Sequence, residues 1–163
     1  MAAKDVILIG VIVFMFAISF FIVYSISNTV ITTMLGISAI NESEAAVEAL
    51  QGSQAVTGRM DYVVFGVFIG LVLALIISGW FIAGNPIFMV IYFLVVVMGV
   101  VLSTVMSNVW ETVSQASIFG TTVTAFPITN NLMMNLPLYL AVIGFLGIIV
   151  MFAKPYFSPQ QQY

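Results

Sequence analysis

Four long apolar runs, none of which contains a residue that is charged at neutral pH, constrain this chain more than any other feature. They cover residues 6–27, 62–82, 87–109 and 136–152. About 20 predominantly apolar residues suffice for a helix to cross the hydrocarbon core of a bilayer. We therefore expect an all-α transmembrane fold, a four-helix polytopic membrane protein that forms a single membrane domain over residues 1–163.

The scarcity of charge supports a lipid environment. Only 6% of the 163 residues are charged, against about a quarter in a soluble domain. A soluble fold of this size would lack the charges to cover its surface. The net charge of −3, with three basic residues, also argues against nucleic-acid binding. Cysteine and histidine are absent from the sequence, which removes disulfides, thiolate chemistry and the commonest transition-metal ligands.

The first run is expected to form a helix over residues 6–27 or longer, because apolar residues resume from Val30 to Ile37. A short acidic helix outside the membrane is expected between Ile40 and Gln54. Asn41 is placed as its N-cap and Gly52 as its end.

The two long loops differ in character. Loop 38–61 is acidic, and its Asn41-Glu42-Ser43 tripeptide matches the acceptor pattern for N-glycosylation. Segment 111–135 is rich in Ser, Thr and Asn and almost uncharged. We expect it to lie at the level of the lipid headgroups or to fold back over the bundle. A re-entrant path would require its backbone to be buried in protein.

Small residues recur every fourth position on both helices of a central hairpin that we expect over residues 62–110. At this spacing, small residues let two helix backbones approach closely in lipid. We predict a tight hairpin with a turn made by Gly84, Asn85 and Pro86. The partner of the first row is either the second row or a second copy of the chain. The predicted packing residues are Gly66, Gly70, Ala74 and Ser78 in the first row and Gly99, Ser103 and Ser107 in the second.

Residues near the ends of the runs are expected to hold the bundle at the membrane surface. Asp61 is expected to cap the second helix. Tyrosine and tryptophan are enriched at membrane–water interfaces. The candidate anchors are Tyr62, Trp80, Tyr92, Trp110 and Tyr139.

The orientation follows from the few charges. Four spans put both termini on one side of the membrane, where Lys4 and Lys154 flank the outer helices, and the acidic loop lies opposite. Because basic residues favour the cytoplasmic side, we expect the termini on the cytoplasmic, inner side.

No catalytic, cofactor-binding or metal-binding residue is predicted. Transporters and proton pumps keep ionisable side chains within their spans, and these runs have none. Serines and threonines lack a His or Lys partner within reach by sequence, so we expect no enzyme. Glu42, Glu44 and Glu48 are interpreted as a solvated acidic face rather than a cation site.

Residues 85–153 carry three short motifs: Asn85-Pro86-Ile87-Phe88, Ser107-Asn108-Val109-Trp110-Glu111 and Phe126-Pro127-Ile128-Thr129-Asn130. In these motifs the chain resembles small integral membrane proteins of bacterial and archaeal viruses with a lipid membrane. The resemblance implies a structural protein of a viral membrane or envelope.

We therefore expect a non-enzymatic structural protein embedded in a lipid bilayer. It would form a homo-oligomer, or anchor other membrane or shell proteins through its loops, with no cofactor. Two alternatives remain open, a pore-forming, holin-type protein and an accessory subunit of a larger membrane complex.

Overall fold

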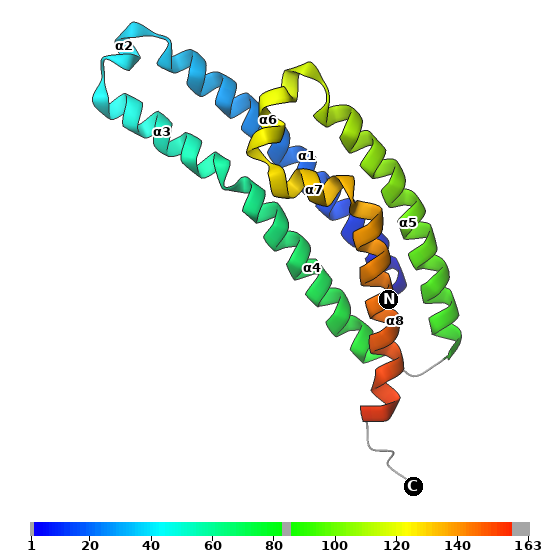
Figure 1. The fold of residues 1–163 in the computed structure, drawn as a ribbon. Helices are drawn as coiled ribbons and strands as arrows, with labels where there is room; N and C mark the ends of the chain where they lie inside the picture. Colours follow the sequence, from blue (N-terminus) through cyan, green and yellow to red (C-terminus); the bar gives the residue numbers. More distant parts are fainter. Residues whose placement is uncertain (1, 83–85, 158–163) are drawn as a thin grey trace.

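The structure, a computed structural model, describes residues 2–82 and 86–157, and this part of the chain is helical almost throughout, with no strand (Figure 1). The long helices are α1 (Ala2–Leu35), α4 (Met60–Ile82), α5 (Pro86–Ser114) and α8 (Leu136–Phe157). The short ones are α2 (Ser38–Asn41), α3 (Glu44–Gly58), η1 (Ser117–Phe119), α6 (Gly120–Ala125) and α7 (Pro127–Met134).

The helices have the length and composition of membrane spans. Three stretches, Lys4–Leu35, Glu44–Ile77 and Val90–Ser114, are long and apolar enough to cross a bilayer. The bent pair α7–α8 provides a fourth if it is counted as one span. The expected integral, multi-pass helical fold is therefore confirmed at the level of three to four apolar helices. The predicted continuation of the first helix is also confirmed, since α1 runs unbroken to Leu35.

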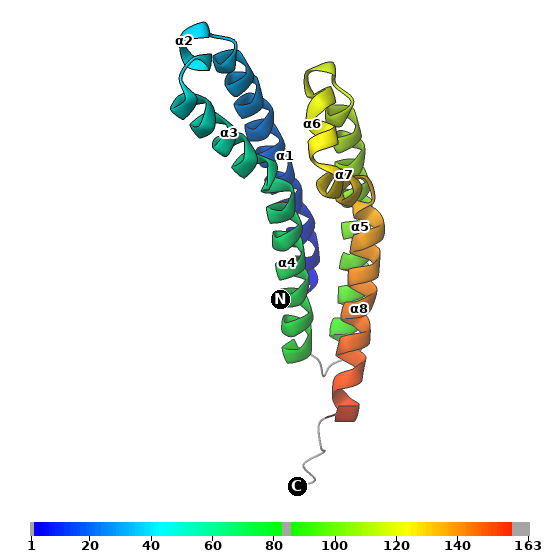
Figure 2. The same cartoon turned by 60° about the vertical axis from the view of Figure 1, so that its left-hand side comes forward.

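The helices form two layers (Figure 2). One layer contains α1 with α3 and α4, and the other contains α5 with α6, α7 and α8. Each layer begins with a long unbroken helix and returns through a broken one. Across the layers, α1 packs on α5 and α4 packs on α8. The N-terminal end of α1 and the C-terminal end of α8 lie toward the same end of the molecule (Figure 1).

The predicted tight pairing of the second and third spans is not what the structure shows. Among the described residues, α4 packs mainly on α1, α7 and α8, and α5 also packs mainly on these three helices rather than on α4. The physical reason is that small residues mark a face that permits close approach without specifying its partner. The broad apolar faces of α1 and α8 supply those partners. Gly84 and Asn85 of the predicted turn lie outside the described residues, and Pro86 is the first residue of α5.

The two small-residue rows therefore have different neighbours. Gly99 faces α1, where a Cβ on it would lie 3.6 Å from Val6 and 3.5 Å from Ile7. Gly66 and Gly70 are exposed, and a Cβ on either would meet no other atom within 4 Å. At both glycines of the first row, the space that a side chain would enter is therefore not occupied by another helix of the same chain.

Two other glycines, on α8, leave room for side chains of α5. Gly144 of α8 faces Val96 of α5, and Gly147 faces the phenol ring of Tyr92. A Cβ on Gly147 would overlap the Tyr92 hydroxyl. This pair was not predicted from the sequence, because the predicted rows have four-residue steps, whereas these glycines are three residues apart. Residues three apart also share a helix face.

The short acidic helix also differs from the prediction. It runs from Glu44 to Gly58, with Ser43 as N-cap, while Asn41 ends α2 and Gly52 lies in the helix interior. An interior glycine costs about 1 kcal/mol. Packing of α3 on α1 offsets this cost, and a hydrogen bond from Gln54 Nε2 to Asn28 Oδ1 of 2.8 Å joins the two helices.

We predict that Gly144→Ala destabilises the bundle by about 1–3 kcal/mol, the usual cost of overpacking a filled site. The added methyl would overlap Val96 Cγ1 and lie 2.9 Å from its Cγ2 and 3.2 Å from its Cβ. Equilibrium unfolding in mixed micelles measures the change. In a Val96→Ala background the same substitution should cost less.

The matched control is Gly66→Ala, where the methyl meets open space. Its effect should stay within about 0.5 kcal/mol. Equal losses for the two alanine variants would contradict close packing at Gly144.

Candidate functional site

The most elaborate part of the molecule is the crossing of α7 over the bundle. The chain after α5 turns back through η1 and α6, and α7 then lies across α1 (Figure 1). Helix α7 meets α8 at an angle of 71°. Segment 111–135 folds back on the bundle, which was one of the expected arrangements, and its helix α7 contacts α1, α4 and α5.

A carboxylate from another helix caps the start of α7. Asp61 of α4 is only 3% exposed. Its Oδ1 accepts a hydrogen bond of 2.7 Å from the Thr129 amide, and its Oδ2 accepts one of 3.1 Å from the Ile128 amide. Pro127 at the first position has no N–H, and the N-cap Phe126 makes no side-chain cap hydrogen bond. Asp61 thus satisfies two N–H groups that a helix start leaves without partners.

This contact corrects the expectation for Asp61. We expected it to cap its own helix, but α4 begins one residue earlier, at Met60. The carboxylate instead serves α7, which lies far away in sequence. A negative charge at a helix N-terminus is also favoured by the helix dipole. No local sequence signal could have identified Ile128 and Thr129 as the partners.

The rest of α7 is tied to α5. The Trp110 indole donates a hydrogen bond of 2.9 Å from Nε1 to Asn130 Oδ1. The Ser107 hydroxyl donates one of 2.8 Å to the carbonyl oxygen of Met134, in the last turn of α7. Asn130 therefore bonds between helices rather than capping one. Together with Asp61, these contacts fix the start, the middle and the end of an eight-residue helix.

An aromatic cluster lies beneath this crossing. The ring centroid of Phe21, in α1, lies 5.0 Å from that of Trp110, 5.1 Å from that of Phe119 and 6.0 Å from that of Phe126. Tyr24 adds an edge-on contact with Phe126 at 5.1 Å. Phe21, Trp110 and Phe126 are all fully buried. Such pairs stabilise a fold beyond the area that they bury, so the cluster holds α1, α5 and segment 111–135 together.

The expected interface anchors are therefore divided. Trp110 and Tyr92 are buried inside the bundle, which corrects their assignment as anchors. Tyr62 is exposed, and Tyr139 packs edge-on against Phe68 at 5.9 Å. The side chain of Trp80 lies outside the described part of the structure. A tryptophan at the membrane surface would donate its indole N–H to water, whereas a buried tryptophan needs a polar partner within the protein. Asn130 is that partner for Trp110.

The remaining predicted residues are scattered over the fold. Asn41 is exposed at the end of α2, and Ala74 is exposed on α4. Ser103 is buried and donates to the carbonyl oxygen of Val100 in its own helix. The side chain of Ser78 lies outside the description. Within the described residues no group of three Asp or Glu side chains is placed to hold a metal ion.

Two buried hydroxyls have no hydrogen-bond partner among the described residues, Tyr92 Oη and Thr129 Oγ1. The first lies against Gly147. The second belongs to the residue whose amide binds Asp61. The side-chain hydrogen bonds of Asp61, Trp110 and Ser107 join helices at the crossing, whereas Asn135 bonds locally to Asn131.

A scan of protein-family models, a search of curated proteins and a search of solved structures find no match to this chain.

We predict that Asp61→Ala exposes the Ile128 and Thr129 amides to exchange. Both N–H groups would lose an ionised acceptor, and each buried unsatisfied donor costs about 1–3 kcal/mol. Amide hydrogen exchange should accelerate at least about tenfold at both positions. Asp61→Asn, which keeps one acceptor oxygen, should show a smaller effect.

Glu111→Gln is the control, because Glu111 is an exposed carboxylate near the same segment. It should leave exchange at both amides unchanged. Unaltered protection in the Asp61→Ala variant would show that the carboxylate does not hold α7.

We predict that Trp110 is shielded from both water and lipid. In a Trp80→Phe variant Trp110 is the only tryptophan, and its complete burial should give blue-shifted emission. Quenching by acrylamide and by brominated lipid should both be weak. Strong quenching by brominated lipid would instead show that Trp110 contacts lipid, as expected of an anchor at the membrane surface.

Proposed function

We propose that this protein is a non-enzymatic structural component of a membrane, packed laterally with copies of itself or with other membrane proteins. The observation that carries the proposal is the core of fully buried apolar and aromatic side chains that joins the helices. Its largest members are Trp110, Tyr92, Phe21 and Phe126. Side-chain hydrogen bonds at the crossing tie helices to one another. These contacts favour cohesion over conduction or turnover.

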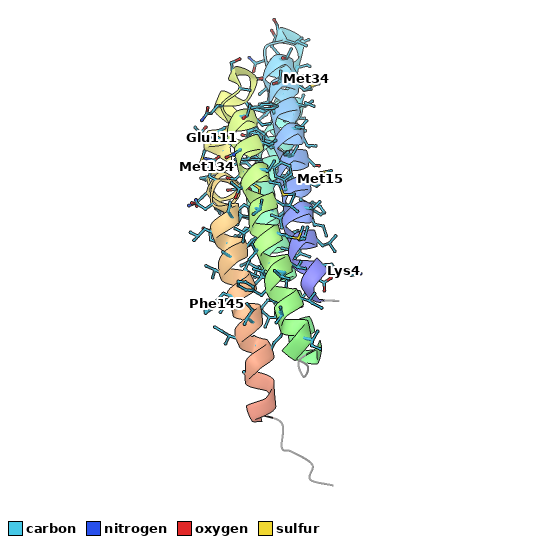
Figure 3. The ribbon with its side chains drawn as sticks, turned by 90° about the vertical axis from the view of Figure 1, so that its right-hand side faces the viewer. Lys4, Met15, Met34, Glu111, Met134 and Phe145 are labelled. Atoms are coloured by element: carbon cyan, nitrogen blue, oxygen red, sulfur yellow. The ribbon has the colours of Figure 1, made fainter. Side chains whose placement is uncertain are left out.

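The acidic end of the molecule is the proposed attachment point for partner proteins. Exposed Glu42, Glu44 and Glu48 lie in or beside α2 and α3, and exposed Glu111 lies near the end of α5. Figure 3 shows Glu111 and Lys4 toward opposite ends of the molecule. The positive-inside tendency puts the end that carries Lys4 on the inner side of the membrane. The acidic end then faces outward, where basic partner surfaces would bind it.

The proposed setting is the membrane of a lipid-containing virus. Its support is the resemblance of three short motifs in residues 85–153 to small membrane proteins of such viruses. Detection of this chain in the membrane of purified particles tests the setting. Particles that contain a membrane but lack this chain would overturn it.

Dye release from vesicles tests the structural role itself. A protein whose helices are joined by a buried apolar core should insert without releasing an entrapped dye, even at high protein content. Release at low protein content would instead favour the pore-forming, holin-type alternative.

We predict that Gly70→Leu weakens self-association about tenfold or more, equivalent to about 1.4 kcal/mol. Gly70 is exposed, and a Cβ added to it would meet no other atom within 4 Å. The monomer fold should therefore survive, while close approach of a second copy is blocked. Energy transfer between labelled copies in vesicles measures the association.

The control is Leu73→Ala on the exposed part of the same helix, where Leu73 is 54% exposed. It removes bulk without obstructing approach and should change association little. Equal association of the two variants would contradict packing through this face.

A further inference from the structure

The two layers carry comparable surface grooves that differ in charge. The groove between α1 and α4 has a volume of about 250 Å³, and its lining includes Asp5, Leu8, Ile12 and Ala74. The groove between α5 and α8 has a volume of about 300 Å³ and an entirely apolar lining that includes Ala141. A carboxylate is thus the feature that distinguishes the first groove from the second.

The position of Asp5 along the bundle makes its charge significant. The groove lining places it beside the Leu71–Leu75 stretch of α4. Helix α4 and its apolar sequence continue to Ile82, about 10 Å further at 1.5 Å per residue. Asp5 therefore lies beside a part of α4 that is still apolar. A charged side chain in apolar surroundings is costly unless it is paired.

No cation of the described chain satisfies Asp5. The neighbouring Lys4 is exposed at the same end of α1 (Figure 3), and the groove lining does not include it. Helix α4 contributes only apolar side chains to the groove. A cationic group from outside the chain would supply the missing partner, and the adjacent Lys4 would supply a positive charge for an accompanying anion.

We propose that the groove between α1 and α4 binds a phospholipid with a primary-amine headgroup. Its ammonium group hydrogen-bonds to the Asp5 carboxylate, and its phosphate lies near Lys4. One acyl chain follows the groove along Leu8, Ile12 and Ala74, a path of about 10 Å on α1. A primary ammonium brings three N–H donors to the carboxylate. A quaternary ammonium brings none, and an anionic headgroup without an amine would be repelled.

Native mass spectrometry of the full chain tests the proposal. The protein is released from bilayer discs that contain equal amounts of phosphatidylethanolamine, phosphatidylcholine and phosphatidylglycerol. Wild-type protein should retain phosphatidylethanolamine about five- to tenfold over phosphatidylcholine, the range expected for one charge-assisted hydrogen bond at the membrane boundary. Asp5→Asn should reduce that ratio to about one.

A pair of filling variants separates this groove from the rest of the surface. Ala74→Phe fills the groove that contains Asp5 and should lower retention of phosphatidylethanolamine. Ala141→Phe fills the apolar groove of the other layer and should leave the headgroup preference unchanged. Glu44→Gln removes an exposed carboxylate elsewhere and should also have no effect.

Two results would overturn the proposal. One is equal retention of the three lipids by the wild-type protein. The other is an unchanged preference in the Asp5→Asn variant. Because asparagine has nearly the shape of aspartate, this variant should fold even if Ala74→Phe does not, and unfolding in micelles checks that it does.

Discussion

The hydrogen bonds between the Asp61 carboxylate and the start of α7 determine much of how this molecule is organised. Without them, an eight-residue helix would begin with two N–H groups lacking acceptors, one of them on the fully buried Thr129. With α7 fixed, Phe126 reaches the aromatic cluster and Asn130 reaches Trp110. One carboxylate on the first layer thereby positions the segment that closes the second.

Much of the fold could be predicted from the sequence. Hydrophobic runs identify helices in lipid because a backbone without water must satisfy its own hydrogen bonds. The continuation of α1 followed from the apolar residues after Thr29. The pairing of helices did not follow in the same way. The row at Gly66 and Gly70 indicated a face suited to close contact, yet the partners of α4 are set by side chains on α1, α7 and α8.

The contacts at the crossing of α7 were harder to predict from the sequence, because they too join segments that are distant along the chain. Trp110 beside Glu111 has the pattern of a membrane-surface anchor, and only the return of segment 111–135 over the bundle buries it. Asp61 likewise has the pattern of a local cap, and its real partners are distant in sequence. Both interpretations relied on neighbours along the chain, whereas contacts between distant segments decide the role of each side chain.

The length of α1 has a consequence for the membranes that would suit this protein. Exposed apolar side chains follow this helix from Leu8 to about Ile26, a distance of about 27 Å at 1.5 Å per residue. The hydrocarbon core of a typical bilayer is about 30 Å thick. Beyond Asn28, α1 packs on the acidic helix α3 and carries exposed threonines. A bilayer of ordinary thickness would therefore cover the apolar part of α1 with little deformation, and the last turns of α1 would stand above the lipid together with α3.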